Sequence, residues 1–199
     1  MIPVNQAPEP ADFDLKVRKP GLAYLQKYGI NIYAPPPEAS KLPPYWTSVS
    51  GELWESYNRV CAYLCLYFEI ASGASTTDHF IAKSENAGLA YEWENYRLAC
   101  LGANRKKNIF DDVLDPFKIK QDTFFLNLAT GEIKPNPGLD QTMQDKCNAT
   151  IERLGLKDPD NNRWRAENFQ EYLQGIVPES YLQRKSPFVW YEARRQGLL

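Results

Sequence analysis

The chain of 199 residues is nearly neutral, with 23 Lys and Arg against 25 Asp and Glu, and its one histidine is His79. With 43% hydrophobic and 24% charged residues it has the composition of one folded domain, which excludes wholesale disorder. The small net charge excludes a protein that coats nucleic acid through bulk positive charge, and the single imidazole excludes metal sites built from several histidines.

The longest unbroken apolar run, residues 60–68, is far shorter than the roughly 20 residues needed to cross a bilayer, so we expect no membrane span. The first residues lack the basic and apolar segments of a secretory signal, which favours a cytoplasmic location. In that compartment we expect reduced thiols at Cys61, Cys65, Cys100 and Cys147.

The first half of the chain divides into an arm and a helical stretch. Prolines punctuate residues 1–45 and predict an extended arm with one short helix over residues 22–28. Apolar residues then recur at helical spacing between Ser50 and Ile70, which predicts a long buried helix. A turn of small residues follows at Gly73.

Two short strands over residues 76–81 and 96–100, joined by a long loop, are expected next, followed by a helix over residues 103–110. The pattern then predicts a hairpin with strands 124–128 and 132–134, a helix from Leu139 to Gly155 and another over residues 165–173. These elements predict an α+β fold with an arm (1–45), a strand–strand–helix core (46–135) and a C-terminal helical lobe (136–199).

The chemistry of the core centres on Asp78 and Asn104. In a strand–loop–strand–helix unit the end of the first strand faces the first turn of the helix, so both side chains can meet at one cation. Both offer oxygen, the ligand that Mg²⁺ or Mn²⁺ prefers. Neighbouring His79 needs a bend at the strand end to reach the same site, because adjacent side chains of a strand point to opposite faces. With that bend, the imidazole can take a proton from water beside a phosphate, which predicts metal-assisted phosphodiester hydrolysis.

The same stretch resembles the HNH, or ββα-metal (His-Me finger), nuclease motif. The three signature positions fall on His79, Asn95 and Asn104, and the metal-binding acid falls on Asp78. The spacing of nine positions from Asn95 to Asn104 is similar to that in the HNH domain of RNA-guided CRISPR nucleases. The resemblance implies that His79 is the general base, that Asp78 and Asn104 hold the metal, and that Asn95 ties the loop and orients the histidine. Asn108 falls where some colicin-type members put another ligand.

Five cations near the motif are candidates for holding the phosphate backbone of a substrate. They are Lys83, Arg97, Arg105, Lys106 and Lys107. Four acidic residues share the same stretch, so a solvated surface face is the alternative interpretation for all five.

Short sequence segments within residues 15–135 are similar to segments of small HNH proteins from bacterial anti-phage operons, Septu-type systems and certain retrons among them. They include residues 17–21, 78–84, 89–100 and 113–117. The resemblance implies a nuclease core embedded in a mostly helical single domain, Mg²⁺ or Mn²⁺ as cofactor, DNA as substrate and an ATPase encoded beside the nuclease as partner.

The cysteines depart from the family pattern. Many such proteins hold a structural zinc with paired Cys-x-x-Cys knuckles, whereas here Leu64 and Ala103 stand where the second cysteines are expected. Two of four thiolates are missing, so we expect no structural zinc and prefer burial of Cys61, Cys65 and Cys100 in an apolar core. We likewise prefer a docked amphipathic helix to a nucleic-acid contact for the aromatic and basic residues 186–195.

Two alternatives stay open. One is a catalytically degenerate binding or scaffold subunit of a defence complex, against which the joint presence of Asp78, His79 and Asn104 weighs. The other is an RNase or tRNA-cleaving toxin, because nothing in the motif separates RNA from DNA. The small net charge predicts that the engagement of DNA is shared with a partner.

Overall fold

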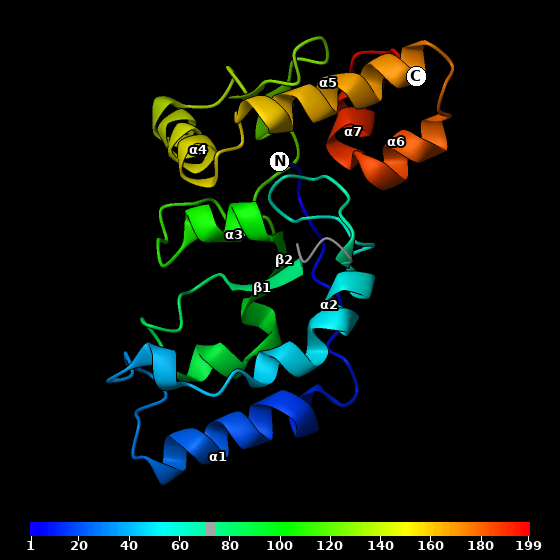
Figure 1. Ribbon diagram of the computed structural model, residues 1–199. Coiled ribbons are helices and arrows are strands. Elements are labelled where there is room, and N and C mark those ends of the chain that lie inside the picture. The colour runs from blue at the N-terminus through cyan, green and yellow to red at the C-terminus, as the bar shows by residue number, and fades with distance from the viewer. Residues whose placement is uncertain (71–74) are drawn as a thin grey trace.

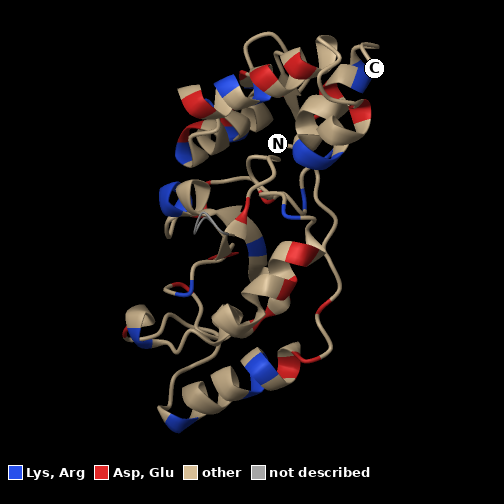
Figure 2. Ribbon diagram, turned by 45° about the vertical axis from the view of Figure 1, so that its right-hand side comes forward, with Lys and Arg blue, Asp and Glu red and all other residues tan. Residues whose placement is uncertain are grey.

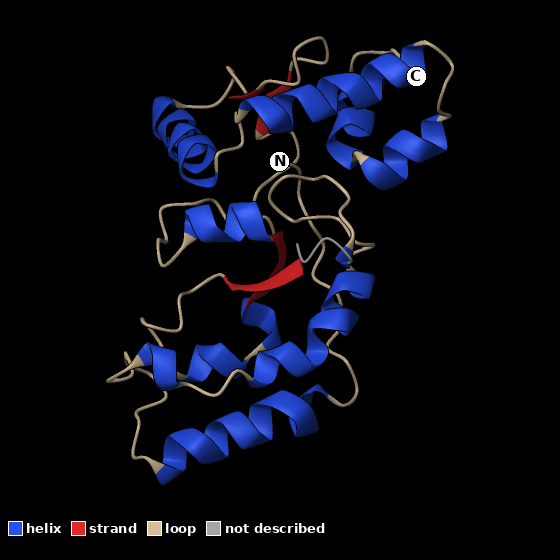
Figure 3. Ribbon diagram, in the orientation of Figure 1, coloured by secondary structure: helices blue, strands red, loops and turns tan. Residues whose placement is uncertain are grey.

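The structure is a computed structural model that describes residues 1–70 and 75–199, so the turn predicted at Gly73 lies outside the described residues. Its fold is α+β, as the sequence predicts, with helices and two antiparallel strand pairs (Figure 3). The helices are α1 (Lys19–Lys27), α2 (Ser50–Ser56), α3 (Leu101–Lys107), α4 (Gln141–Leu154), α5 (Pro159–Leu173), α6 (Glu179–Lys185) and α7 (Pro187–Arg195). The strands are β1 (Ser75–His79), β2 (Tyr96–Cys100), β3 (Phe124–Leu126) and β4 (Ile133–Pro135).

Helix α1 lies at one end of the molecule and α4 to α7 at the other, with β1, β2 and α3 between them (Figure 1). One cluster of buried apolar side chains extends from the first residues to Ala193, so the three segments expected from the sequence share a core. Two polar contacts join the segment after α3 to helix α4. Leu114 N donates a hydrogen bond to Thr150 Oγ1 at 2.8 Å, and Arg153 forms an ion pair with Asp112 at 2.9 Å.

The N-terminal segment is more ordered than the extended arm that its prolines predict. A π-helical turn, Asp14–Arg18, runs directly into α1, whose early Pro20 occupies a position where no backbone N–H is needed. Gly21 packs against the ring of Tyr91, where any Cβ would collide with the ring atoms. The segment therefore covers the core closely.

The prediction of one long helix between Ser50 and Ile70 is wrong. Helix α2 ends at Ser56, and Asn58 and Arg59 adopt positive φ angles of 52° and 64°, which a helix does not contain. The chain then doubles back, with an isolated bridge between Val60 and Tyr67. Leu53, Trp54, Tyr57, Cys61 and Leu64 are buried all the same, so the spacing of these apolar residues does not indicate one continuous helical face.

Strands β1 and β2 form an antiparallel pair and confirm the two strands predicted around the long loop. In their register Asp78 lies opposite Arg97, and His79 lies opposite Tyr96. Helix α3 follows β2 without a linker and packs against both strands. It ends where Asn108 adopts a φ of 50°, which an α-helix does not contain. The end of β1 and the helix bearing Asn104 therefore lie together.

The C-terminal half follows the prediction except that α5 starts earlier and that α6 is not among the predicted helices. Helix α4 is capped by the Asp140 side chain, which accepts from Met143 N at 2.8 Å, and ends at Gly155 with a φ of 60°. Strands β3 and β4 confirm the hairpin, and α7 confirms a docked helix over the aromatic tail. Helix α5 starts at Pro159, earlier than predicted, because its first turn is polar and gives no periodic signal. None of the helices in the described part is long and apolar enough to cross a membrane.

Candidate active site

A pocket of about 500 Å³ opens at the end of β1, between this strand end, α3 and the loop that follows β1. Six of the residues singled out in the sequence line it: Asp78, His79, Lys83, Asn104, Arg105 and Asn108. A larger hollow of about 880 Å³ lies between the first residues, the turn after α2 and α6, and none of the candidate residues lines it. The smaller pocket is therefore the candidate active site.

His79 is the last residue of β1 and is held by the loop before β2. Its Nε2 lies 3.1 Å from the carbonyl oxygen of Ala90, which can only accept, so Nε2 carries the proton and Nδ1 keeps its lone pair. Burial, together with the charges of Lys83 and Lys107, lowers the pKa of His79 below its ordinary value of 6.5. The imidazole is therefore neutral at pH 7 and presents one basic nitrogen.

Two aromatic rings fix the plane of this imidazole. Trp46 meets it edge to face with ring centroids 4.7 Å apart and an interplanar angle of 86°, and Tyr96 does so at 5.1 Å and 78°. The ammonium of Lys83 lies 4.6 Å from the centre of the Trp46 ring, a cation–π contact. Sequence reasoning missed Trp46, because it lies more than 30 residues before the motif (79 minus 46) in a proline-rich stretch without periodicity.

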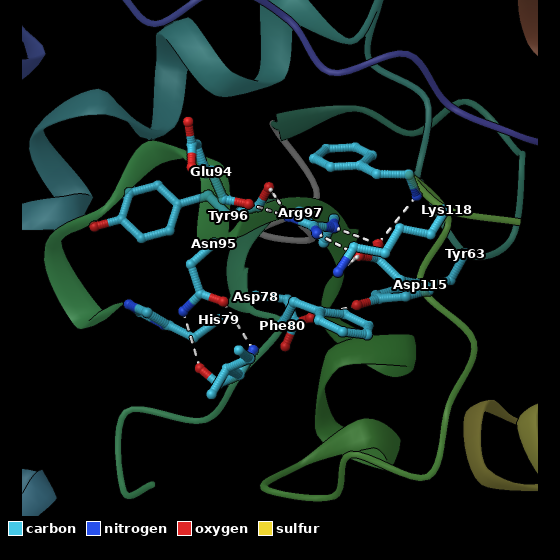
Figure 4. A network of polar contacts seen from close by, with 12 residues as sticks. Tyr63, Asp78, His79, Phe80, Glu94, Asn95, Tyr96, Arg97, Asp115 and Lys118 are labelled. Atoms are coloured by element: carbon cyan, nitrogen blue, oxygen red, sulfur yellow. Dashed lines mark hydrogen bonds and ion pairs between the residues drawn. The ribbon is translucent and has the colours of Figure 1, made fainter. Parts of the chain in front are cut away.

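Asn95 does not line the pocket, and within the described residues its side chain hydrogen-bonds to backbone atoms. Its Oδ1 accepts from Ile81 N at 2.8 Å, and its Nδ2 donates to the carbonyl oxygens of Ile81 and Leu89, both at 2.9 Å. These bonds tie the loop after β1 to the segment before β2 and so support the strand end that carries His79 (Figure 4). Asn95 has a positioning role in this geometry and not a place beside the substrate.

Asp78 is only 2% exposed, and both of its carboxylate oxygens have a partner. One accepts a hydrogen bond from the Tyr63 hydroxyl, and the other lies 3.3 Å from the ammonium of Lys107. Burial raises the pKa of Asp78, while Lys107 and Tyr63 oppose that rise. Asp78 nevertheless lines the pocket together with its neighbour His79.

Asn104 and Asn108 supply the remaining candidate metal ligands. The Nδ2 of Asn104 donates to Thr76 Oγ1 at 3.0 Å, which leaves its Oδ1 as the atom available to a ligand, and Asn108 is exposed at the rim. Within residues 1–70 and 75–199 no group of three or more His, Cys, Asp or Glu side chains gathers around one point. The oxygen atoms of Asp78 and Asn104 fit a hard cation such as Mg²⁺ that takes most of its ligands from water and substrate.

Three of the five predicted phosphate contacts lie away from the pocket. Arg97 is buried and makes two hydrogen bonds to Asp115, at 2.9 and 2.8 Å (Figure 4). Lys107 is fully buried, and Lys106 pairs with Asp158 at the start of α5. The structure gives Arg97 and Lys107 a structural role in place of the predicted phosphate contact, because a desolvated cation keeps its protein partner.

The cysteines are free thiols in the structure. Cys61 and Cys65 are buried, as expected, whereas Cys100 is only partly buried, and Cys147 is buried as well. Cys61 Sγ accepts from Cys100 N at 3.4 Å. A hydrogen bond from the Cys61 thiol lowers the pKa of Cys100 to about 7, while burial raises the pKa of Cys61. The two thiols therefore differ sharply in their expected reactivity.

No model of a protein family matches the chain, and no curated protein resembles it significantly. The functional conclusion consequently depends on the pocket and on the sequence motif that lines it.

Proposed function

We propose that the protein is an HNH-type endonuclease that hydrolyses phosphodiester bonds of DNA with the help of a divalent cation. In this proposal β1, β2 and α3 form the ββα-metal core. The observation that carries it is the meeting of Asp78, His79 and Asn104 on the wall of one pocket, with the imidazole held in a single tautomer.

His79 is the general base in this mechanism. Hydrolysis joins a water oxygen to phosphorus and releases one of the two bridging oxygens, and the water gives up a proton as it attacks. Nδ1 of His79 accepts that proton, because Nε2 is already committed to the carbonyl of Ala90. Trp46 and Tyr96 hold the ring so that little reorientation is needed.

Asp78 and Asn104 would hold the cation, with Asn108 at the rim of the pocket. When bound, a divalent cation stabilises negative charge on the phosphate and on the leaving oxygen. Tyr63 and Lys107 keep the Asp78 carboxylate in place, and Thr76 orients the amide of Asn104. Lys83 and Arg105 line the same pocket and are the side chains that would contact the phosphate backbone.

We also propose, from the resemblance to anti-phage nucleases, that the protein is the effector subunit of a bacterial cytoplasmic defence complex with an ATPase. The charge distribution of the protein supports a DNA-binding surface that is formed together with the partner subunit. Basic and acidic segments alternate along the ribbon without a broad run of one sign (Figure 2), so the chain by itself offers DNA little bulk attraction.

The proposal is tested by incubating the protein with supercoiled plasmid and with a folded RNA in Mg²⁺, in Mn²⁺ and in EDTA. We expect nicking of the plasmid with either cation and none in EDTA. Cleavage that persists in EDTA would contradict the metal-dependent mechanism, and cleavage confined to RNA would replace DNA by RNA as the substrate.

A further inference from the structure

The pocket of His79 has more positive than negative side chains. Among the described residues that line it, Lys83 and Arg105 are the cations and Asp78 is the one acid. The negative charge of Asp78 is in turn matched by Lys107 directly behind it, at 3.3 Å. In the described structure the charges of the pocket therefore favour binding of an anion over binding of a cation.

Lys107 is held in a fixed position beside Asp78. The side chain is 0% exposed, and its ammonium donates to the carbonyl oxygens of His79 and Phe80, at 3.1 and 3.0 Å, besides facing Asp78. An ammonium has three protons, and each has an acceptor here. Lys107 is thus fixed beside Asp78, and it repels a divalent cation there at short range, where water screens weakly.

A phosphate group reverses this balance. It brings negative charge to Lys83 and Arg105, and its oxygens are the hard ligands that Mg²⁺ prefers. We propose that the pocket binds a phosphate first and takes up the divalent cation only together with it. The proposal rests on the proposed nuclease function for the identity of that phosphate as a nucleic-acid phosphodiester, but the order of binding stands on the charges alone.

The single histidine makes the order of binding measurable without any turnover. His79 is the one histidine of the protein, so its Cε1–H resonance is the one histidine Cε1–H signal and can be followed by NMR without further assignment. Inorganic phosphate and Mg²⁺ are titrated separately and then together, with NaCl as the ionic-strength control. Phosphate alone is expected to shift the signal, and Mg²⁺ alone is not. The apparent affinity for Mg²⁺ is expected to rise about tenfold in phosphate, and that for phosphate to rise by the same factor in Mg²⁺.

Two neighbouring variants localise the effect. Arg105→Gln removes a cation that lines the pocket, and Lys106→Gln removes one that pairs with Asp158 outside it. We expect the first to weaken phosphate binding about tenfold and the second to change it much less. Equal effects of the two would assign phosphate to general surface charge and overturn the proposal, as would Mg²⁺ binding of equal strength with and without phosphate.

The outcome separates this inference from the proposed function. Phosphate-dependent uptake of Mg²⁺ in a protein that cleaves no nucleic acid would keep the binding order and refute the nuclease. Cleavage by a protein that binds Mg²⁺ first would keep the nuclease and refute the binding order.

Discussion

The imidazole of His79 and the hydroxyl of Tyr96 donate to the same carbonyl oxygen, that of Ala90, at 3.1 and 2.7 Å. The two residues are also partners in the register of β1 and β2. The strand pairing and the loop between the strands thus act together on the ring of His79. This shared acceptor explains how a half-buried imidazole keeps one tautomer at the edge of an open pocket.

Trp46 should matter for catalysis through the position of His79. Trp46→Leu removes a ring contact worth about 1 kcal/mol, so we expect the productive orientation of the imidazole to be about fivefold less populated. The value of kcat should fall by this factor while KM changes little, and the His79 Cε1–H resonance should broaden. Trp190→Leu, in α7, is the control and should leave both readouts unchanged; a Trp46→Leu protein with wild-type kcat would refute the role.

Lys107 should be needed for folding, unlike its neighbour Lys106. Lys107→Met leaves Asp78 buried without its counter-charge and is expected to lower the free energy of unfolding by about 4 kcal/mol. Lys106→Met breaks a half-exposed ion pair with Asp158 and should cost about 1 kcal/mol or less. Urea unfolding followed by circular dichroism measures both. Similar losses for the two variants would show that the buried ion pair is unimportant.

The positioning role of Asn95 should depend on the hydrogen bonds that its amide nitrogen donates. Asn95→Asp keeps the shape of the side chain but puts an oxygen against the carbonyls of Ile81 and Leu89, and we expect a loss of about 3 kcal/mol in stability. The loop that Asn95 ties should then become accessible to protease. Asn148→Asp, at an exposed position of α4, is the control for the added charge. An Asn95→Asp protein as stable and protease-resistant as the wild type would remove the positioning role.

Cys100 should be the most reactive thiol at neutral pH. Its pKa is lowered to about 7, so its thiolate fraction rises as the pH passes through 7, whereas Cys61 stays a thiol throughout because its pKa is raised. Alkylation by iodoacetamide between pH 5.5 and 8.5, followed by peptide mass spectrometry, should give a rate for Cys100 that increases with a midpoint near 7. A midpoint near the ordinary value of 9.0 would contradict the contact with Cys61.

Local signals in the sequence predict much of this structure. The cap at Asp140, the left-handed Gly155 and the turn of the β3–β4 hairpin each depend on residues within a few positions of one another. The turn after α2 escapes prediction because apolar residues such as Cys61 and Leu64 are buried by distant segments and not by a helical face. The same spacing of apolar residues is therefore compatible with the long helix that the sequence predicts and with the turn that the structure has.

The candidate site divides in the same way. The motif predicts that Asp78, His79 and Asn104 meet, because their spacing is set within one strand–strand–helix unit. It does not predict Trp46 or Tyr63, whose contacts with this unit arise only when segments distant in sequence pack against it. The motif also does not predict that Arg105 lines the pocket while Lys107 is buried. Both side chains are positively charged, but residues two positions apart on a helix point in different directions.

The most direct test of the account is the rate of plasmid cleavage by His79→Ala compared with the wild type, at equal concentration in Mg²⁺. Folding of the variant is verified by its thermal unfolding, and Lys106→Gln serves as the control for a nearby change. A general base contributes about 100-fold or more, so we predict that His79→Ala loses cleavage by at least that factor while Lys106→Gln retains it. A folded His79→Ala protein that cleaves plasmid at the wild-type rate would contradict the proposed mechanism.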